Sequence, residues 1–496
     1  MILRRSEQPA LDLAPPAQHR GHGSTKVVAV LAACGILMAL QQTMFLPVLP
    51  DLPALVNTSA SNASWLITAT LVTGAVGTPL IGRCADLFGK KRMMLLVLLV
   101  VVAASVLGAL SNSLPVLLVA RSLQGCGLSL IPVAMAAMRD VLPPRRVPNG
   151  VATMSASMAV GAAAGLPLSG MIVTFLDWHA IFWLVAMTGA LLAAAVARTV
   201  PSSPSRGSEP FDRLGALMLA IILTSLMVPL SKGAQWGWTD LRTVLLTVFG
   251  ILALAAWIPL EWRARAPLVD LRIAARVPVV LVNGCSLLIG FALFSNILLT
   301  TQLLQLPVET GFGAGLTVLQ AGVALMPIAL VGIVIAPVAA GAISRFGAHR
   351  VLLAAAVELA AAFAARVQLS REPWQILAGA VLVGIGLSFT IAAIPTLIMS
   401  MTPLAQSAAA TGMSSLLQSV GTSTASATLA ATSTTWTQPG ASGTTPGLTA
   451  FITVFWIAAC AALVAAALAF FIRPSVPNHS IAEARDIPSP ATPRKT

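Results

Sequence analysis

The chain has 496 residues, of which 57% are hydrophobic and only 9% are charged. Its mean hydropathy of +0.90 excludes a soluble globular protein, in which about a quarter of residues carry charge. The net charge of +13 does not indicate a nucleic-acid partner, because the basic residues lie in short clusters between apolar runs. The composition therefore predicts an integral membrane protein with the lipid bilayer as its partner.

The cysteines form no disulfide or metal pattern, so we expect them to act as small hydrophobic side chains, without a metal centre or cofactor. They are Cys34, Cys84, Cys126, Cys285 and Cys460. Residues 1–25 are polar and the first apolar run is long enough to span a membrane, so we expect no signal peptide. The excess of arginine over lysine is typical of GC-rich bacterial genomes, which favours the cytoplasmic membrane of a bacterium.

A spanning helix needs about 20 apolar residues, and the sequence contains fourteen candidates. They are 27–50, 64–82, 93–111, 115–138, 150–175, 178–198, 213–231, 241–262, 277–300, 317–341, 351–366, 374–400, 407–432 and 449–472. If residues 1–26 are cytoplasmic, nearly every Lys and Arg lies on the cytoplasmic side, as the positive-inside rule requires. The exceptions are Lys232, Arg242, Arg366 and Arg371, which lie outside, and Arg121, which lies within a helix.

The predicted fold is an all-α polytopic bundle of two six-helix halves plus two inserted helices. The expected parts are a cytoplasmic N-tail (1–26), one half (27–198), a linker with the inserted pair (199–276), the other half (277–472) and a cytoplasmic C-tail (473–496). Short matches between the halves support a repeat: Phe88-Gly89 and Phe346-Gly347, then Val160-Gly161 and Val420-Gly421. Residues 407–432 are rich in Ser, Thr, Gly and Ala, so we expect this helix to pack inside the bundle.

A compact charged turn, residues 82–92, forms the predicted loop after the second predicted helix. Its glycines allow a tight turn or a close approach, its acid can accept hydrogen bonds from a helix N-terminus, and its cations suit an anionic membrane surface. The residues are Gly82, Asp86, Gly89, Lys90, Lys91 and Arg92. We predict a gate in which Asp86 contacts a helix end near Arg139 or helix 351–366; the alternative is a topological anchor.

Arg121 lies about six residues inside the fourth helix, where an arginine costs about 2.5 to 3.5 kcal/mol on insertion scales. It either extends to the outer interface or bonds polar groups within the bundle. Because Gln41 and Gln42 lie at a similar depth, we predict that one of them is its neighbour. A cavity lined by Gln41, Gln42, Thr43, Arg121 and Gln124 would accept bulky amphiphilic compounds, anionic ones among them.

The fifth helix carries Gly161, Gly165, Pro167 and Gly170. Glycines allow close helix packing and a proline tends to kink a helix. This pattern indicates either plain packing between helices or a surface on which two helices rock.

These motifs together resemble the major facilitator superfamily, and within it the fourteen-helix drug:proton antiporters. Residues 82–92 resemble the loop signature of the family, Arg121 to Gly127 its helix-four signature and Gly161 to Gly170 its antiporter motif, although Leu166 splits the usual Gly-Pro pair. The segments 177–183 and 267–272 also resemble this branch. The resemblance implies alternating access driven by a proton gradient, with a small-molecule substrate and a monomeric protein.

One departure from that family concerns the proton. Where its first helix often has an acid, this chain has Gln41 and Gln42, and an amide cannot gain and lose a proton near neutral pH. Glu358 is the acid that lies well inside a predicted helix. We therefore predict that Arg121 and Glu358 couple proton movement to substrate transport. The alternative for Glu358 is a structural glutamate with a polar neighbour or one that extends towards the cytoplasm.

The expected function is therefore export of small amphiphilic compounds of drug or antibiotic type by proton antiport. Proton-coupled import, export of a lipid or metabolite, and a transporter-like sensor that moves nothing stay open as alternatives. An ATP-driven pump is disfavoured because no G-x-x-x-x-G-K-[ST] loop occurs. An enzyme is disfavoured because the sequence offers no nucleophile with a base, no paired carboxylates and no metal cluster.

Overall fold

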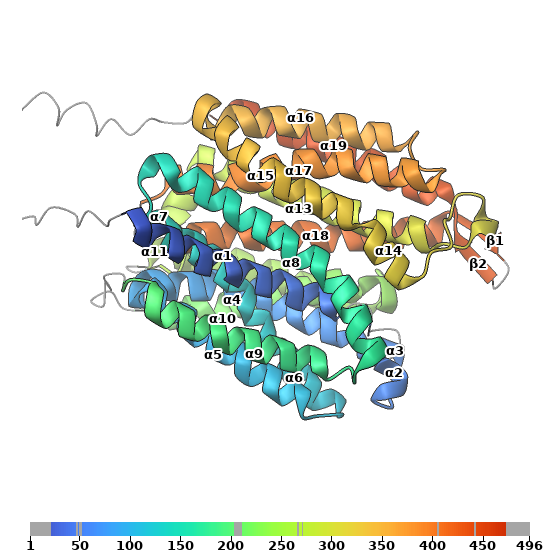
Figure 1. The fold of residues 1–496 in the computed structure, drawn as a ribbon, viewed down its shortest axis with the longest axis horizontal. Coiled ribbons are helices and arrows are strands. Elements are labelled where there is room, and N and C mark those ends of the chain that lie inside the picture. The colour runs from blue at the N-terminus through green and yellow to red at the C-terminus, as the bar shows by residue number, and fades with distance from the viewer. Residues whose placement is uncertain are drawn as a thin grey trace, which may run out of the picture.

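The computed structural model describes residues 21–45, 48, 52–202, 211–264, 267–269, 271–403, 406–440 and 443–472. Long helices run roughly parallel to one another through the molecule (Figure 1). Most of the predicted N-tail and all of the predicted C-tail, 473–496, lie outside the described residues, as does Asp270.

The N-terminal half is built from up-and-down helices joined by short connections. Within it, α6, the 3-10 helix η1 and α7 form one continuous span, Leu114–Val141. The bounds are α1 Gly21–Met44, α2 Leu52–Leu55, α3 Ala60–Ala63, α4 Trp65–Phe88, α5 Lys90–Ala109, α6 Leu114–Gly125, η1 Cys126–Ser129, α7 Leu130–Val141, η2 Pro144–Arg146, α8 Val147–Phe175 and α9 Ala180–Thr199.

The inserted pair and the C-terminal half follow. The inserted helices are α10 Arg213–Trp236 and α11 Leu241–Arg263. The C-terminal elements are α12 Leu271–Ala274, α13 Val277–Gln305, η3 Val308–Thr310, α14 Val318–Ala324, α15 Met326–Phe346, α16 Ala348–Arg366, α17 Pro373–Met401, α18 Ser407–Thr435, β1 Thr437–Gly440, β2 Gly443–Pro446 and α19 Leu448–Phe471. The two strands form an antiparallel hairpin in which Thr437 pairs with Pro446.

The helix count agrees approximately with the fourteen predicted spans. Among the described residues, thirteen helical spans are long and apolar enough to cross a membrane. The fourteenth is α18, a helix of 29 residues rich in small and hydroxyl side chains. It lies within the bundle between α4 and α13, as the small residues of 407–432 predict.

The charged stretch 82–92 is not a loop, which corrects the prediction of a compact turn. Residues Gly82 to Phe88 form the end of α4, and α5 begins at Lys90. Gly89 alone makes the turn, with φ of 98°, a conformation that L side chains rarely adopt. The second copy behaves in the same way, because Gly347, with φ of 85°, separates α15 from α16.

The glycines that suggested a repeat occupy equivalent places in the two halves. A Cβ atom added at Gly161 of α8 would overlap the backbone of Ile36 in α1. A Cβ atom added at Gly421 of α18 would likewise overlap the backbone of Leu287 in α13. In each half, therefore, the fifth helix crosses the first at a glycine, which permits the close approach that stabilises helix pairs in lipid.

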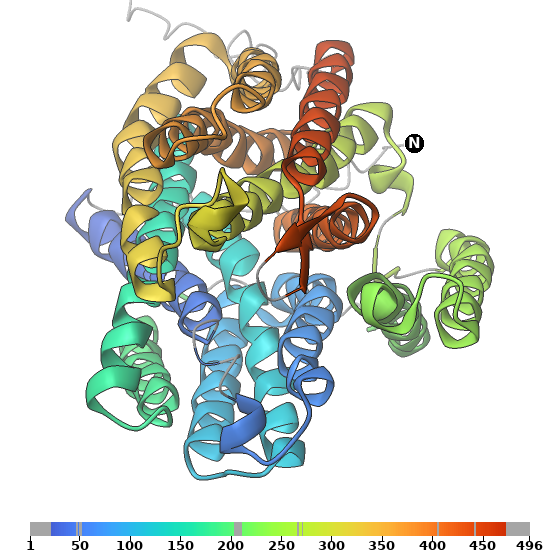
Figure 2. The same cartoon turned by 90° about the vertical axis from the view of Figure 1, so that its right-hand side faces the viewer.

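The most extensive contacts between the two halves are those of α8 with α15 and of α4 with α18. At the first pair, a Cβ atom built at Gly332 would lie 2.9 Å from the Cβ atom of Ala159. The inserted helices α10 and α11 lie on the flank of the bundle (Figure 2). There α10 packs on both α4 and α18, so its apolar side covers the contact between these two helices.

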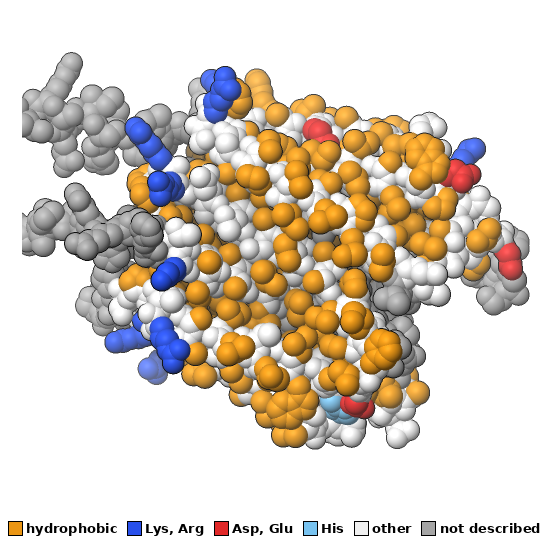
Figure 3. Space-filling view, in the orientation of Figure 1, with side chains coloured by type: hydrophobic (Ala, Val, Ile, Leu, Met, Phe, Trp, Pro, Cys, Tyr) orange, Lys and Arg blue, Asp and Glu red, His pale blue; other side chains and the backbone are white. Residues whose placement is uncertain are grey.

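The surface divides into an apolar flank and charged ends. Figure 3 shows hydrophobic side chains over the flank and Lys and Arg gathered at the end where α1 begins. The exposed cations at helix ends there include Lys26, Arg92, Arg145, Arg146, Arg198, Arg345 and Arg350. We call this the Gly89 end, after the turn between α4 and α5, and the opposite end the hairpin end, after β1 and β2.

Candidate functional site

Asp86 joins the two halves at the Gly89 end. Its Oδ2 accepts a hydrogen bond of 2.9 Å from the backbone N–H of Ala409, and its Oδ1 accepts one of 3.3 Å from Ala408. Both amides belong to the first turn of α18, whose N–H groups have no partner within the helix. A carboxylate at this position also interacts favourably with the helix dipole.

Gly82 makes that contact sterically feasible. A Cβ atom at this position would lie 2.8 Å from the carbonyl oxygen of Ala408, closer than side chains tolerate. The hydrogen-bond partner of Asp86 is thus the start of α18, and neither predicted partner, the helix end near Arg139 or helix 351–366, is correct. The reason is that α4 pairs with α18 at the contact between the halves, whereas α16 packs within the C-terminal half.

Two cations strengthen the same contact. Lys90 Nζ lies 2.7 Å from Asp140 Oδ2 and also donates to Ser407 Oγ at 3.4 Å, so it connects α5, α7 and α18. Arg139 Nη2 donates to the carbonyl oxygen of Thr402 at 3.0 Å. We call Asp86, Lys90, Arg139 and Asp140 the gate cluster; of the neighbouring cations, Lys91 is partly exposed and Arg92 is exposed.

Arg121 points into the N-terminal half and does not extend to the surface. Its side chain is 3% exposed, and Nη1 donates to Gln124 Oε1 at 2.9 Å. Gln124 Nε2 in turn donates to Ser105 Oγ at 2.8 Å, and Gln41 Nε2 donates to the Gln124 carbonyl oxygen at 3.1 Å. Arg121 and Gln41 therefore meet at Gln124, and the guanidinium lies over the ring of Phe45, 4.4 Å from its centroid.

The predicted cavity residues divide into two groups. Gln41, Arg121 and Gln124 are buried in this hydrogen-bonded cluster, while Gln42 and Thr43 are partly exposed. Among the described residues, Arg121 forms no ion pair with a carboxylate, in keeping with the absence of an acid from the first helix. The cluster is thus held by uncharged partners.

Glu358 lies in the other half, on α16. Its carboxylate abuts Gly386 of α17, and its Oε2 is buried without a hydrogen-bond partner among the described residues. An unpartnered ionised carboxylate is costly away from water. The structure does not bring Glu358 and Arg121 together, since each lies among the helices of its own half.

The fifth-helix motif faces its own half. Gly161 and Gly165 contact α1, with Gly165 against Thr43, while α8 runs without interruption past Pro167 and Gly170 to Phe175. The contact of α8 with the C-terminal half includes Ala159 instead. These glycines therefore pack helices within one half.

Two buried cations were not predicted as functional residues. Arg366 is 0% exposed, and its Nη1 donates to Asn296 Oδ1 at 2.5 Å and to Thr300 Oγ1 at 2.9 Å. Lys232 of α10 is 1% exposed and donates to Ser64 Oγ at 2.5 Å. Both had been exceptions to the positive-inside rule, which was the sequence signal that could have identified them.

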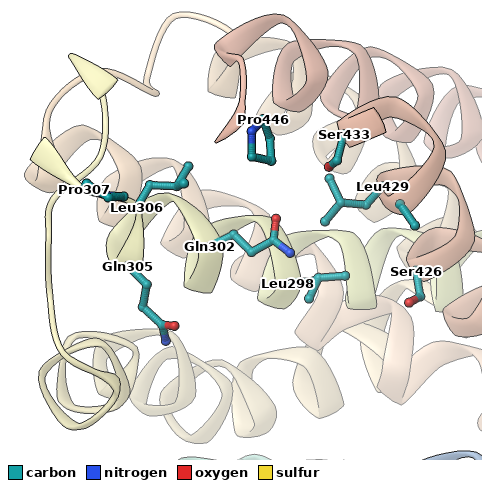
Figure 4. A pocket seen from close by; sticks show the side chains of 10 residues that line it. Leu298, Gln302, Gln305, Leu306, Pro307, Ser426, Leu429, Ser433 and Pro446 are labelled. Carbon is teal, nitrogen blue, oxygen red and sulfur yellow. The ribbon is translucent and has the colours of Figure 1, made fainter. Parts of the chain in front are cut away.

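A pocket of about 460 Å³ opens at the hairpin end, between α13 and α18. Figure 4 shows the Gln302 amide of α13 in this pocket, with Leu429 and Ser433 of α18 across from it. The space lies at the opposite end of the bundle from the gate cluster. The gate cluster thus joins the two halves at one end, and at the other end this pocket opens between two helices of the C-terminal half.

The sequence profile described as Major Facilitator Superfamily matches residues 31–426 and 336–496. The chain belongs to the major facilitator superfamily. Membership in this superfamily makes the protein a multi-pass membrane transporter and not an enzyme.

Curated relatives and solved structures agree with this assignment. The chain is 27% identical over 420 residues to the "Tetracenomycin C resistance and export protein" of Streptomyces glaucescens, covering 84% of this chain and 77% of the relative. It is 24% identical over 417 residues to the "Multidrug resistance protein Stp" of Mycobacterium tuberculosis, covering 83% and 76%.

Two solved superfamily structures share the fold. The human organic anion transporter MFSD10 gives a TM-score of 0.66 at 16% identity, covering 90% of this chain and 99% of that one. The proton:xylose symporter XylE gives a TM-score of 0.66 at 14% identity, covering 92% and 97%. These likenesses establish the major facilitator architecture predicted from the signatures.

Proposed function

We propose that this superfamily member exports small amphiphilic compounds across the cytoplasmic membrane of a bacterium by alternating access. The observation that carries the proposal is the pairing of a closed gate cluster at the Gly89 end with an open pocket at the hairpin end. Exposed cations gather at the Gly89 end, so the positive-inside rule assigns that end, and with it both termini, to the cytoplasm. The conformation is then outward-facing, with the substrate path open to the exterior.

Alternating access requires the Asp86 contact with α18 to break when the inner side opens. The gate cluster suits this task because Asp86, Lys90 and Arg139 each bond a group of the C-terminal half, while Lys90 also pairs with Asp140 within the N-terminal half. Direction is proposed from the names of the two relatives above, one an export protein and both associated with resistance.

The energy source we propose is a proton gradient, without a bound cofactor and within a single monomer. Glu358 is the proposed proton carrier, since its carboxylate lacks a polar partner among the described residues and can exchange a proton without breaking an ion pair. Arg121 is proposed to hold the polar core of the N-terminal half during the cycle.

Accumulation of fluorescent or radiolabelled drugs in a deletion strain, with and without an uncoupler, tests this function. Export predicts higher accumulation in the deletion strain, and a difference that disappears when the uncoupler collapses the gradient. Lower accumulation in the deletion strain would indicate an importer. Equal accumulation for every compound, with altered expression of other genes, would indicate a sensor.

A further inference from the structure

The pocket at the hairpin end is built from uncharged side chains. Its polar residues include Gln302 and Gln305 on α13 and Ser426 and Ser433 on α18, and its apolar walls include Leu298 and Leu429. Its volume of about 460 Å³ falls within the range of about 300–1,000 Å³ typical of sites for small molecules. Amide and hydroxyl groups offer both donors and acceptors, and the pocket contributes no counter-charge.

The hydroxyl groups of α18 show which side chains are available to a ligand. Most described serines and threonines of this helix donate to a carbonyl oxygen of their own helix three or four residues earlier. They are Thr411, Ser415, Ser419, Thr422, Ser423, Thr424, Thr428, Thr432 and Thr435. Ser414 bonds Ser286 instead, and Ser407 belongs to the gate contact.

Ser426 and Ser433 differ from all of these. Among the described residues, neither hydroxyl has a protein partner, and both line the pocket. They are seven residues apart, which places them two turns apart on one face of α18. Gln302 lies opposite Ser433, and its amide also has no protein partner among the described residues.

We propose that this pocket is the outward-facing binding site and that its ligands are uncharged amphiphiles with hydrogen-bonding groups. That these ligands are transported substrates rests on the proposed export function. A charged ligand would lose hydration here without meeting an opposite charge, whereas an uncharged one exchanges water for amide and hydroxyl partners. This differs from the predicted cavity around Arg121, whose guanidinium is buried and engaged with Gln124.

Ligand protection of single cysteines tests the location without any need for transport. The full chain, with its native cysteines replaced by serine, receives Gln302→Cys, Ser433→Cys or the control Gln42→Cys, which samples the cavity predicted from sequence. Uncharged chloramphenicol and podophyllotoxin are compared with the cation ethidium and an anilinonaphthalene sulfonate. We expect the uncharged probes to slow maleimide labelling at positions 302 and 433 but not at 42, and the charged probes to protect none of the three.

Protection at position 42 alone, or no protection by uncharged probes at 302 and 433, would overturn the assignment. A second variant tests the ligand class. Gln302→Glu keeps the shape of the side chain and adds a charge; we expect binding of chloramphenicol to weaken about tenfold and ethidium to be bound. The matched control is Gln375→Glu at the start of α17, which is also at the hairpin end but not in the pocket. This substitution should change the binding of neither chloramphenicol nor ethidium.

The export function and the location of the binding site can be refuted independently of each other. Labelling protection without any export of the uncharged probes from cells would contradict the export function and leave the binding site standing. Export of uncharged probes with no protection at 302 and 433 would place the site elsewhere.

Discussion

Replacing Asp86 by asparagine tests how much the charge of Asp86 contributes to keeping the gate closed. The aspartate accepts two backbone hydrogen bonds from α18, at 2.9 and 3.3 Å, and places a negative charge at the helix N-terminus. Asparagine keeps one acceptor oxygen but loses the charge and one bond. Hydrogen bonds to charged groups are the stronger kind, and a charge at a helix terminus contributes about 0.3 to 2 kcal/mol. A loss of about 1 to 2 kcal/mol would shift the closed-to-open ratio about 5- to 30-fold.

Distances across the Gly89 end measure that shift. Spin labels at Arg145→Cys, in the N-terminal half, and Arg350→Cys, in the C-terminal half, are exposed and lie on opposite sides of the contact. We expect pulsed dipolar spectroscopy to show a longer second distance gaining population in Asp86→Asn, with slower transport but retained substrate binding. The control is Asp212→Asn, because Asp212 caps α10 by accepting from Gly215 N–H but does not join the halves. Identical distance distributions in wild type and Asp86→Asn would refute the assignment of a gate.

Three further substitutions test other parts of the molecule. Glu358→Gln should abolish transport driven by a pH gradient in proteoliposomes but leave substrate exchange intact. Unchanged pumping would show that Glu358 is not the proton carrier. Gly161→Ala should destabilise the protein by about 1 to 3 kcal/mol, because the added Cβ meets the backbone of α1; Gly341→Ala has open space and should not lower Tm. Asn296→Leu removes a partner of the buried Arg366 and should cost about 1.5 to 3 kcal/mol, so an unchanged Tm would contradict this role.

Hydropathy and charge placement could predict the bundle because they follow directly from the bilayer. Apolar runs of sufficient length and cations on one side are requirements of insertion. The glycine pairs near 161 and 421 also predicted the repeat correctly, since a close helix crossing requires the absence of a side chain. What these patterns could not show was that residues 82–88 continue α4, because a charged segment at a membrane surface is compatible with either helix or loop.

The site was less predictable because it depends on which face of each helix turns inward. The polarity of Gln41 and Arg121 indicated a buried cluster, but not that Gln124 would link them. Ser426 and Ser433 are two among many hydroxyls in α18. Only the placement of α13 beside that helix distinguishes them from neighbours bonded to their own backbone.

The composition of α18 also has a consequence for how the chain is made. Its 29 residues include too few large apolar side chains to partition into lipid as an independent segment. In the folded bundle, the polar groups of α18 are satisfied by hydrogen bonds to the helix backbone and by contacts with α4 and α13. Lipid offers no such partners. Membrane insertion of this segment therefore depends on helices synthesised before it. A C-terminal half expressed without α4 should therefore leave α18 accessible to glycosylation or labelling on one side of the membrane.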